Sequence, residues 1–147
     1  MKIIEIVENK KQYLDLLLLA DEQEDMIDRY LDKGRMFVLD DKGVKCECIV
    51  TDEGNGILEI KNIATLPEFQ RKGYAKALIA FLVEKYSDCY SVLQVGTGDS
   101  PLTVPFYENC GFTRSHSIPN FFTDNYDHPI YECGMQLIDM VYFQRPL

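Results

Sequence analysis

The chain has 147 residues, of which 46% are hydrophobic and 27% are charged, and its net charge at neutral pH is −9. This length and composition are typical of one soluble globular domain, which we expect to span residues 1–147. The excess of 24 carboxylates over 15 lysines and arginines argues against nonspecific binding to nucleic acid. No apolar run approaches the roughly 20 residues of a membrane span, and no cleavage-site pattern follows the N-terminus. We therefore expect a cytoplasmic protein that does not enter a membrane.

In chain order, the first half predicts one strand, two helical stretches and three further strands. Residues 2–7 alternate between apolar and charged side chains, as a strand does. Two helical stretches fill residues 9–33, and the second spaces its apolar side chains along one helix face. Residues 35–41 and 44–52 form a predicted hairpin, and residues 56–66 form the next strand after a glycine-containing turn.

The second half begins with a helix. Apolar residues recur at three- and four-residue spacing over 73–86, and a buried strand follows at 90–97. A second helix is expected over 100–112, with Ser100 as its N-cap. Pro105 lies inside that stretch and predicts a short or kinked helix.

Two strands are expected after this helix, the last of them at 135–143, after an aromatic and acidic loop at 119–133. The full order is strand, helix, helix, three strands, helix, strand, helix and two strands. This order predicts an α/β or α+β domain with a mixed, mostly antiparallel sheet flanked by helices.

The cysteines do not form a recognisable disulfide framework, since their number is odd and their spacing is irregular. Cys46 and Cys48 would point to the same face of a strand. A zinc site would need about two more soft ligands, and only His116 and His128 are available. We favour small buried side chains for the two cysteines, and we expect no metal site.

A basic stretch with a glycine stands just before the predicted helix over 73–86. A helix start offers unpaired N–H groups and a partial positive charge, which suits an anion. Gly73 lets the backbone approach an anion closely, and Ala75 keeps the surface small beside it. Arg71 and Lys72 add positive charge. The stretch predicts a site for a polyanion, with a charged surface turn as the alternative; it reads Gln70, Arg71, Lys72, Gly73, Tyr74, Ala75.

The element order and this motif resemble the GNAT superfamily of acetyl-CoA-dependent N-acetyltransferases. The family signature is Gln or Arg, two residues, Gly, one residue, and then Gly or Ala, which residues 70–75 match. The stretch "FYENCGF" at 106–112 is similar to the family's second signature, which comes one strand later. "NYDHPIYECG" and "LIDMVYF" are similar to the ends of a bacterial GNAT subgroup. The resemblance implies the GNAT fold and an acyltransferase.

The resemblance also implies where coenzyme A binds. Its pyrophosphate is expected on residues 70–75. Its pantetheine arm is expected beside Ile63, Ala64 and Thr65, where the family's strand splays at a bulge. Ser100 stands where the family often has an asparagine that contacts this arm. Acetyl-CoA is therefore the expected co-substrate.

Acetyl transfer to an amine needs a base, because an amine with a pKa of about 10 is mostly protonated at neutral pH. The resemblance to the histone-acetylating branch implies Glu59 as this base. The alternative for Glu59 is a surface glutamate in an alternating strand, and Asp124 and Glu132 are second choices for the base. A backbone N–H between Ile63 and Thr65 is expected to stabilise the oxyanion.

The leaving thiolate needs a proton donor, and a phenol within reach can supply it. Tyr107, in "FYENCGF", matches the general-acid tyrosine of the family. The alternative for Tyr107 is a core aromatic at a helix end.

The acceptor side is expected to be acidic and aromatic. Residues 115–144 contain four acids and no lysine or arginine, and residues 21–30 add Asp21, Glu22, Asp25 and other acids. Acids and aromatics together suit a cationic amine, such as a polyamine, an aminoglycoside-like compound or a lysine-type amine. The alternative is solvated acids beside core aromatics. The candidate acceptor-binding residues are Asp25, Phe122, Asp124, Tyr126 and Glu132.

Three functions are compatible with these residues. The first is an N-acetyltransferase acting on a small amine. The second is a non-catalytic acyl-CoA-binding sensor or interaction module that keeps the fold. The third is an acetyltransferase for protein lysines or N-termini. Glu59 and Tyr107 favour catalysis, because a binding module needs only the anion site. A homodimer is plausible from the family alone.

Overall fold

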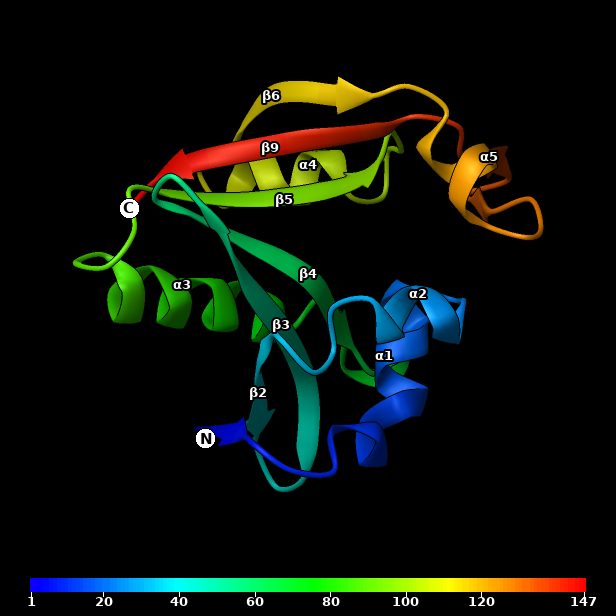
Figure 1. Cartoon of the computed structure of the whole chain (residues 1–147). Coiled ribbons are helices and arrows are strands. Elements are labelled where there is room, and N and C mark those ends of the chain that lie inside the picture. Colours follow the sequence, from blue (N-terminus) through cyan, green and yellow to red (C-terminus); the bar gives the residue numbers. More distant parts are fainter.

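Figure 1 shows a computed structural model of the chain, which describes every residue from 1 to 147. Seven strands form one sheet in the order β1-β2-β3-β4-β5-β9-β6, and β7 and β8 form a separate hairpin. All neighbours in the large sheet are antiparallel except β4 and β5. The predicted mixed, mostly antiparallel sheet is confirmed. The strands are β1 (Lys2–Ile6), β2 (Arg35–Asp40), β3 (Val44–Gly54), β4 (Ile57–Thr65), β5 (Val92–Gly98), β6 (Thr113–Ile118), β7 (Tyr131–Glu132), β8 (Met135–Gln136) and β9 (Met140–Pro146).

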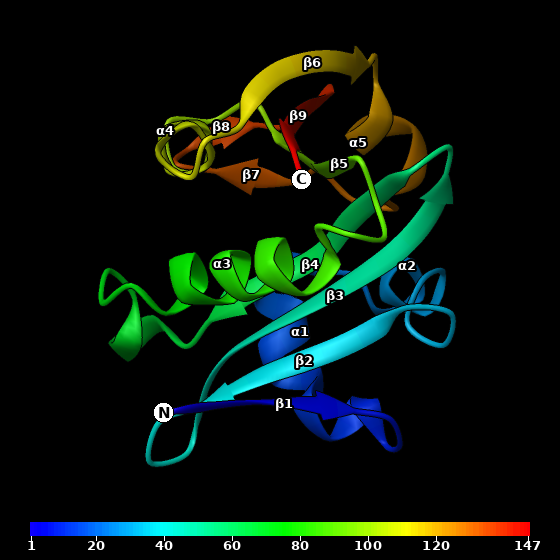
Figure 2. The ribbon, with the colours of Figure 1, turned by 90° about the vertical axis from the view of Figure 1, so that its left-hand side faces the viewer.

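Helices cover both faces of this sheet (Figure 2). Leu78 and Leu82 of α3 share one buried cluster with Ile60 of β4. Leu17 of α1 shares a second cluster with Ile49 of β3, on the other face. Side chains alternate between faces along a strand, so β2 and β3 supply residues to both clusters. The helices, two of them short 3-10 turns, are η1 (Lys10–Tyr13), α1 (Leu14–Ala20), α2 (Glu24–Asp28), η2 (Pro67–Phe69), α3 (Tyr74–Tyr86), α4 (Val104–Asn109) and α5 (Phe121–Asn125).

The sheet opens between its two central strands. β4 and β5 pair only from Ile57 with Val92 to Ile60 with Val95. β4 then continues to Thr65, and β5 continues away from it, so the two strands diverge (Figure 1). The pairing of β3 with β4 shifts register at the same point. Lys61 is the extra residue of the resulting β-bulge, and such bulges bend a strand.

Cys46 and Cys48 are fully buried in the cluster beneath α3, as predicted for small apolar side chains. Burial raises the pKa of the Cys46 thiol to about 12, so this thiol stays protonated at neutral pH. No group of three or more histidine, cysteine, aspartate or glutamate side chains is arranged to hold a metal ion. None of the helices is long and apolar enough to cross a membrane.

The helix predicted over 100–112 is shorter and begins later than expected. α4 starts at Val104, with Thr103 before it, so Pro105 lies in the first turn. The first-turn N–H groups of a helix have no intrahelical partner, and proline there removes no hydrogen bond. Of the short or kinked helix predicted from Pro105, the short helix is confirmed, since α4 has six residues. Ser100 is not the N-cap of α4, although its carbonyl accepts a hydrogen bond from the Val104 N–H at 3.2 Å.

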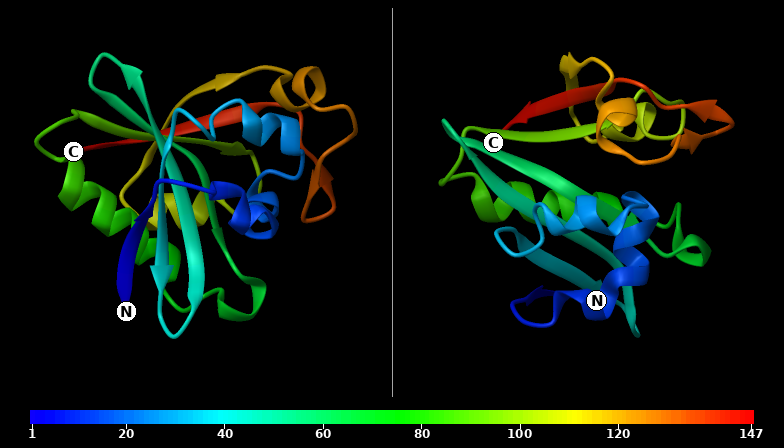
Figure 3. Two further views of the ribbon diagram at one scale, coloured as in Figure 1. Left: turned by 60° about the horizontal axis from the view of Figure 1, so that its bottom comes forward. Right: turned by 45° about the vertical axis from the view of Figure 1, so that its right-hand side comes forward.

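The last strand also differs from its predicted bounds of 135–143. β9 begins at Met140, because the preceding residues form the β7–β8 hairpin and a turn. The Asp139 carboxylate in that turn accepts a hydrogen bond from the Asn120 N–H at 2.8 Å. The predicted loop at 119–133 contains α5. The chain continues from α5 into the β7–β8 hairpin (Figure 3). Phe122 of α5 forms a small buried cluster with Ile130 and Leu137, which flank the hairpin.

Candidate active site

A cleft of about 840 Å³ lies where β4 and β5 diverge. Both strands line it, together with residues 19–22 at the end of α1, residues around the start of α3 between 69 and 76, and segments between 101 and 140. Small-molecule sites typically enclose roughly 300–1,000 Å³. The cleft is therefore large enough to hold two small molecules, or a small molecule beside part of a longer molecule.

One end of the cleft is the predicted anion site. Arg71 and Gly73 both have left-handed backbones, with φ of 62° and 87°. The N–H groups of residues 71–73 donate to no backbone acceptor, and α3 has no side-chain cap. A Cβ placed on Gly73 would meet no protein atom within 4 Å. Free N–H groups beside open space at a helix start fit a phosphate group.

Five of the six motif residues line this part of the cleft: Gln70, Arg71, Gly73, Tyr74 and Ala75. Lys72 does not line it, and its Nζ lies 5.4 Å from the centre of the Phe69 ring. The Tyr74 hydroxyl donates a hydrogen bond to the Asp41 carboxylate at 2.7 Å, which fixes the first residue of α3. Lys76 also lines the cleft and was not predicted. Lys76 is three residues after Gly73, and residues at this spacing lie on the same face of a helix. This spacing could have indicated that Lys76 lines the cleft.

The floor of the cleft is the free side of β4. Ile63, Ala64 and Thr65 line it, as predicted. Their strand has no partner on the β5 side beyond Ile60. Backbone groups on that side are therefore available to an extended ligand. Ser100 does not line the cleft; it is buried, and its Oγ accepts a hydrogen bond from the Leu102 N–H at 3.1 Å.

Tyr107 of α4 lies at the centre of the cleft wall. Its ring is buried among Phe112, Phe143 and Phe106, yet it also lines the cleft, and its hydroxyl has no hydrogen-bond partner in the protein. The ring therefore matches the core-aromatic alternative, and the free hydroxyl is compatible with the predicted general acid, which stays a prediction. Burial raises the pKa of this phenol well above its ordinary value, and the negative charge of Glu132 adds to the effect. Tyr107 stays protonated at neutral pH.

The structure does not bring Glu59 to the cleft. Its side chain is only 6% exposed, and Lys61 Nζ lies 2.8 Å from its Oε2. Its Oε1 accepts a hydrogen bond of 2.6 Å from Gln94 Nε2. The alternating pattern of β4 suggested a solvent-facing glutamate, but the neighbouring strand β5 covers it and supplies Gln94. Lys61 stands between this carboxylate and the cleft, which Lys61 itself lines.

The acidic residues of the cleft are only partly those predicted. Glu132 lines the cleft, whereas Asp25 and Asp124 are exposed outside it. Asp21 and Glu22 line it instead. Asp21 and Glu22 both belong to the acidic stretch at 21–30. The helical spacing of that stretch does not show where α1 ends, and so it does not show which of the acids face the cleft.

Asp21 is held in a network that the sequence did not reveal. Its two oxygens accept hydrogen bonds from the hydroxyls of Tyr126 at 2.6 Å and Tyr30 at 2.9 Å. Tyr30 in turn accepts a hydrogen bond of 3.0 Å from Asn62 Nδ2, on β4. Burial raises the pKa of the Asp21 carboxyl, although the two phenols act against this rise. The network ties the end of α1 to β4 and to the segment after α5.

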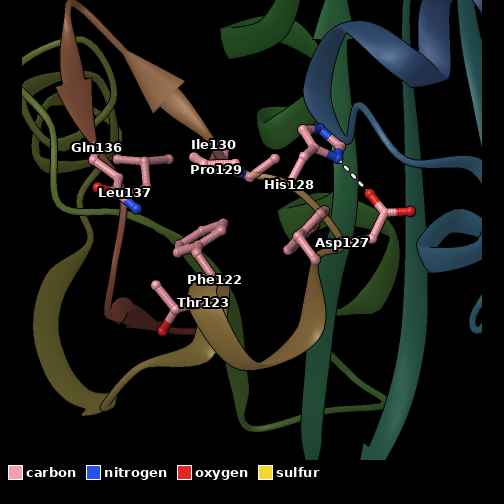
Figure 4. Close-up of a pocket in the computed structure, with 9 residues that line it drawn as sticks. Phe122, Thr123, Asp127, His128, Pro129, Ile130, Gln136 and Leu137 are labelled. Carbon is pink, nitrogen blue, oxygen red and sulfur yellow. Dashed lines mark hydrogen bonds and ion pairs between the residues drawn. The ribbon is translucent and has the colours of Figure 1, made fainter.

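Further contacts hold the segment after α5 against the α1–α2 connection. His128 Nδ1 pairs with Asp127, as Figure 4 shows, and His128 Nε2 lies 2.9 Å from Glu22 Oε1. The Asp127 N–H donates to Gln23 Oε1 at 3.1 Å. Phe122 and Tyr126, which were predicted to bind the acceptor, line the cleft beside this contact. We call residues 19–22 and 122–140 together the acceptor wall.

Comparison with known proteins agrees with this geometry. A family model described as an acetyltransferase (GNAT) domain matches residues 32–114. YvbK of Bacillus subtilis, described as an uncharacterized N-acetyltransferase, is 33% identical over 146 residues, which cover 91% of this chain and 88% of YvbK.

Two solved structures share the whole fold. A GNAT family acetyltransferase from Elizabethkingia anophelis with acetyl-CoA bound has a TM-score of 0.92 and 31% identity, covering 99% of this chain and 97% of that one. A Bacillus subtilis acetyltransferase in complex with CoA has a TM-score of 0.90 and 31% identity, covering 99% and 98%. The resemblance found in the sequence is thereby confirmed: the chain belongs to the GNAT family of acetyltransferases.

Proposed function

We propose that the chain transfers the acetyl group of acetyl-CoA to the primary amine of a small molecule, with both reactants bound in the cleft. The observation that carries the proposal is the opening between β4 and β5. It joins the free N–H groups before α3, the free side of β4 and the Tyr107 hydroxyl in one space. The relatives with acetyl-CoA or CoA bound support acetyl-CoA as the co-substrate.

The residues present fit coenzyme A. The N–H groups around Arg71 and Gly73 would hold the pyrophosphate, with Arg71 and Lys76 adding positive charge. The free side of β4 at Ile63–Thr65 would hold the amide-containing arm in the way an added strand is held. When bound, acetyl-CoA supplies an acetyl group on a thioester. A backbone N–H of β4 would stabilise the negative charge on the carbonyl oxygen during attack.

Tyr107 is the proton donor in this proposal. Its phenol is protonated at neutral pH, lines the cleft and has no other hydrogen-bond partner. It can therefore give its proton to the departing thiolate without first breaking a contact in the protein.

Glu132 is the base in this proposal, in place of Glu59. Its carboxylate lines the cleft and makes no ion pair or hydrogen bond in the protein. It lines the same cleft as Tyr107, and its negative charge contributes to the raised pKa of that phenol. A free carboxylate on the acceptor side can both attract an ammonium group and remove its proton.

The test is acetyl-CoA turnover with a panel of primary amines, measured as thiol release, for wild type and Tyr107→Phe. Loss of the proton donor should lower kcat by a factor on the order of 100 or more. The affinity for acetyl-CoA, measured by calorimetry, should change little, because Tyr107 lies away from the anion site. Tight acetyl-CoA binding without turnover for any amine would contradict the proposal and favour a binding module. Turnover with lysine peptides alone would favour a protein acetyltransferase.

A further inference from the structure

We infer that the acceptor is a monoamine whose single ammonium group is attached to an apolar or aromatic body, and not a polyamine or an aminoglycoside. The inference rests on the proposed acetyl transfer and narrows its substrate class. It follows from which acids of the acceptor wall are free and from what surrounds them.

Most acids that made the sequence suggest a polycation are already engaged. Asp127 pairs with His128, and Glu22 lies 2.9 Å from the same ring. Asp139 accepts a hydrogen bond from the backbone of Asn120. Asp124 is exposed outside the cleft. Asp127, Asp139 and Asp124 do not line the cleft, and Glu22, which does line it, is paired with His128.

Three acids line the cleft, and only one of them has no partner. Asp21 already accepts hydrogen bonds from two tyrosine hydroxyls, and Glu22 pairs with His128. Glu132 has no partner and acts electrostatically on Tyr107. The cleft therefore offers one carboxylate without a partner, and Tyr107 lines the same cleft.

The other residues of the acceptor wall that line the cleft are apolar or aromatic. Phe122, Ile130 and Leu137 form its buried part, and Figure 4 shows their side chains gathered together. Leu19 and Tyr131 line the cleft with 50% and 60% of their surface exposed. Exposed apolar side chains at the edge of a cleft are typical of a ligand site that buries them.

A second ammonium group would meet this apolar surface without a free partner. Removing a charge from water without pairing it opposes binding, whereas a methyl group or ring at the same place would bury Leu19 and Tyr131. A ligand with one ammonium group and an apolar body therefore fits the acceptor wall best.

The experiment compares hexylamine with hexamethylenediamine, which share a six-carbon chain and differ in whether its far end carries a second ammonium group. For wild type we expect kcat/KM to favour hexylamine by roughly tenfold or more, since an unpaired polar group in an apolar site costs about this factor. Leu19→Asp should reduce this preference by providing a second carboxylate. Leu19→Asn is the matched control, because it removes the apolar side chain without adding charge, and it should not favour the diamine.

Binding of the same two amines to the protein saturated with CoA, measured by calorimetry, separates the inference from the proposed function. Tighter binding of hexylamine without turnover would support the inference and contradict acetyl transfer. Turnover that favours the diamine in wild type would overturn the inference and leave acetyl transfer in place. Turnover only with a peptide whose N-terminal residue is apolar would overturn it in favour of a protein acceptor.

Discussion

Glu59 and Glu132 have the same side chain in opposite surroundings, which makes them a matched pair. Glu59 is held by Lys61 and Gln94 away from the cleft, whereas Glu132 is free within it. We expect Glu132→Gln to lower kcat roughly 100-fold, as the loss of a general base does. Glu59→Gln should leave kcat within a few-fold and lower the free energy of unfolding by about 1–3 kcal/mol, because the buried Lys61 contact is lost.

These two variants need only steady-state rates and urea unfolding. A large fall of kcat in Glu59→Gln with unchanged stability would contradict the assignment and return the base to β4. Equal activity of wild type and Glu132→Gln would leave proton removal to water or to Asp21.

Alanine substitutions at Gly73 and Gly54 distinguish the effect of backbone strain from the effect of ligand contact. Gly73 has φ of 87°, and Gly54 in the β3–β4 turn has φ of 81°; added Cβ atoms at both positions meet no protein atom. Alanine should therefore lower the free energy of unfolding by about 1 kcal/mol at either position. Only Gly73→Ala should also raise KM for acetyl-CoA, because its Cβ would stand where a phosphate approaches. An unchanged KM in Gly73→Ala would contradict the pyrophosphate site.

At the scale of elements, the contact between the α1–α2 connection and the segment after α5 depends on pH through His128. Asp127 and Glu22 raise the pKa of His128 above its ordinary value of about 6.5. A raised pKa in the folded protein means that the charged ring stabilises the fold at pH values below about 6.5. This contribution is lost as the pH rises through the folded-state pKa.

We therefore expect wild type to unfold at higher urea concentration than His128→Asn at low pH, and the two midpoints to converge at alkaline pH. The exposed ring makes the difference small. His116 is the control: it stacks on Tyr142 and has no carboxylate within ion-pairing distance, so His116→Asn should show no such convergence. A difference that grows with pH would contradict the assigned charge pair.

The sequence predicted these elements unevenly, for physical reasons. The strands up to β4 and the helix α3 follow from local periodicity, and the anion site follows from the glycine that begins α3. Pro105 correctly indicated a short helix, but the start at Val104 was missed, because Ser100 and Pro101 also form a suitable start pattern. The surroundings of the Asp21 and Glu59 side chains depend on residues that come much later in the chain, such as Tyr126 and Gln94. A local sequence pattern does not reveal such distant partners.

At the scale of the whole molecule, two free strand edges remain, at β1 and β6. Neither edge is covered by another element of the sheet, and β6 is exposed along its whole length. The homodimer stays a prediction, and sedimentation of the purified chain would test it. The opening between β4 and β5 divides the same sheet into an N-terminal part and a C-terminal part.

These two parts of the sheet are joined by only four paired residues on each central strand, Ile57–Ile60 and Val92–Val95. A ligand that binds along both strands should stabilise their association. At about 100 times its Kd, acetyl-CoA should raise the free energy of unfolding by about 2.7 kcal/mol, if it binds only the folded chain. Hydrogen exchange should slow along Lys61–Thr65 on the β5 side, since these N–H groups gain a partner only when the ligand is bound.

Exchange at Ile57–Ile60 is the internal control, because β5 already covers that part of β4. Its rates should follow only the global stabilisation. Free CoA should protect the start of α3 as well as acetyl-CoA does, because both carry the pyrophosphate. Equal protection of both parts of β4, with none at residues 71–76, would mean that the ligand binds elsewhere and that the opening between β4 and β5 is not its site.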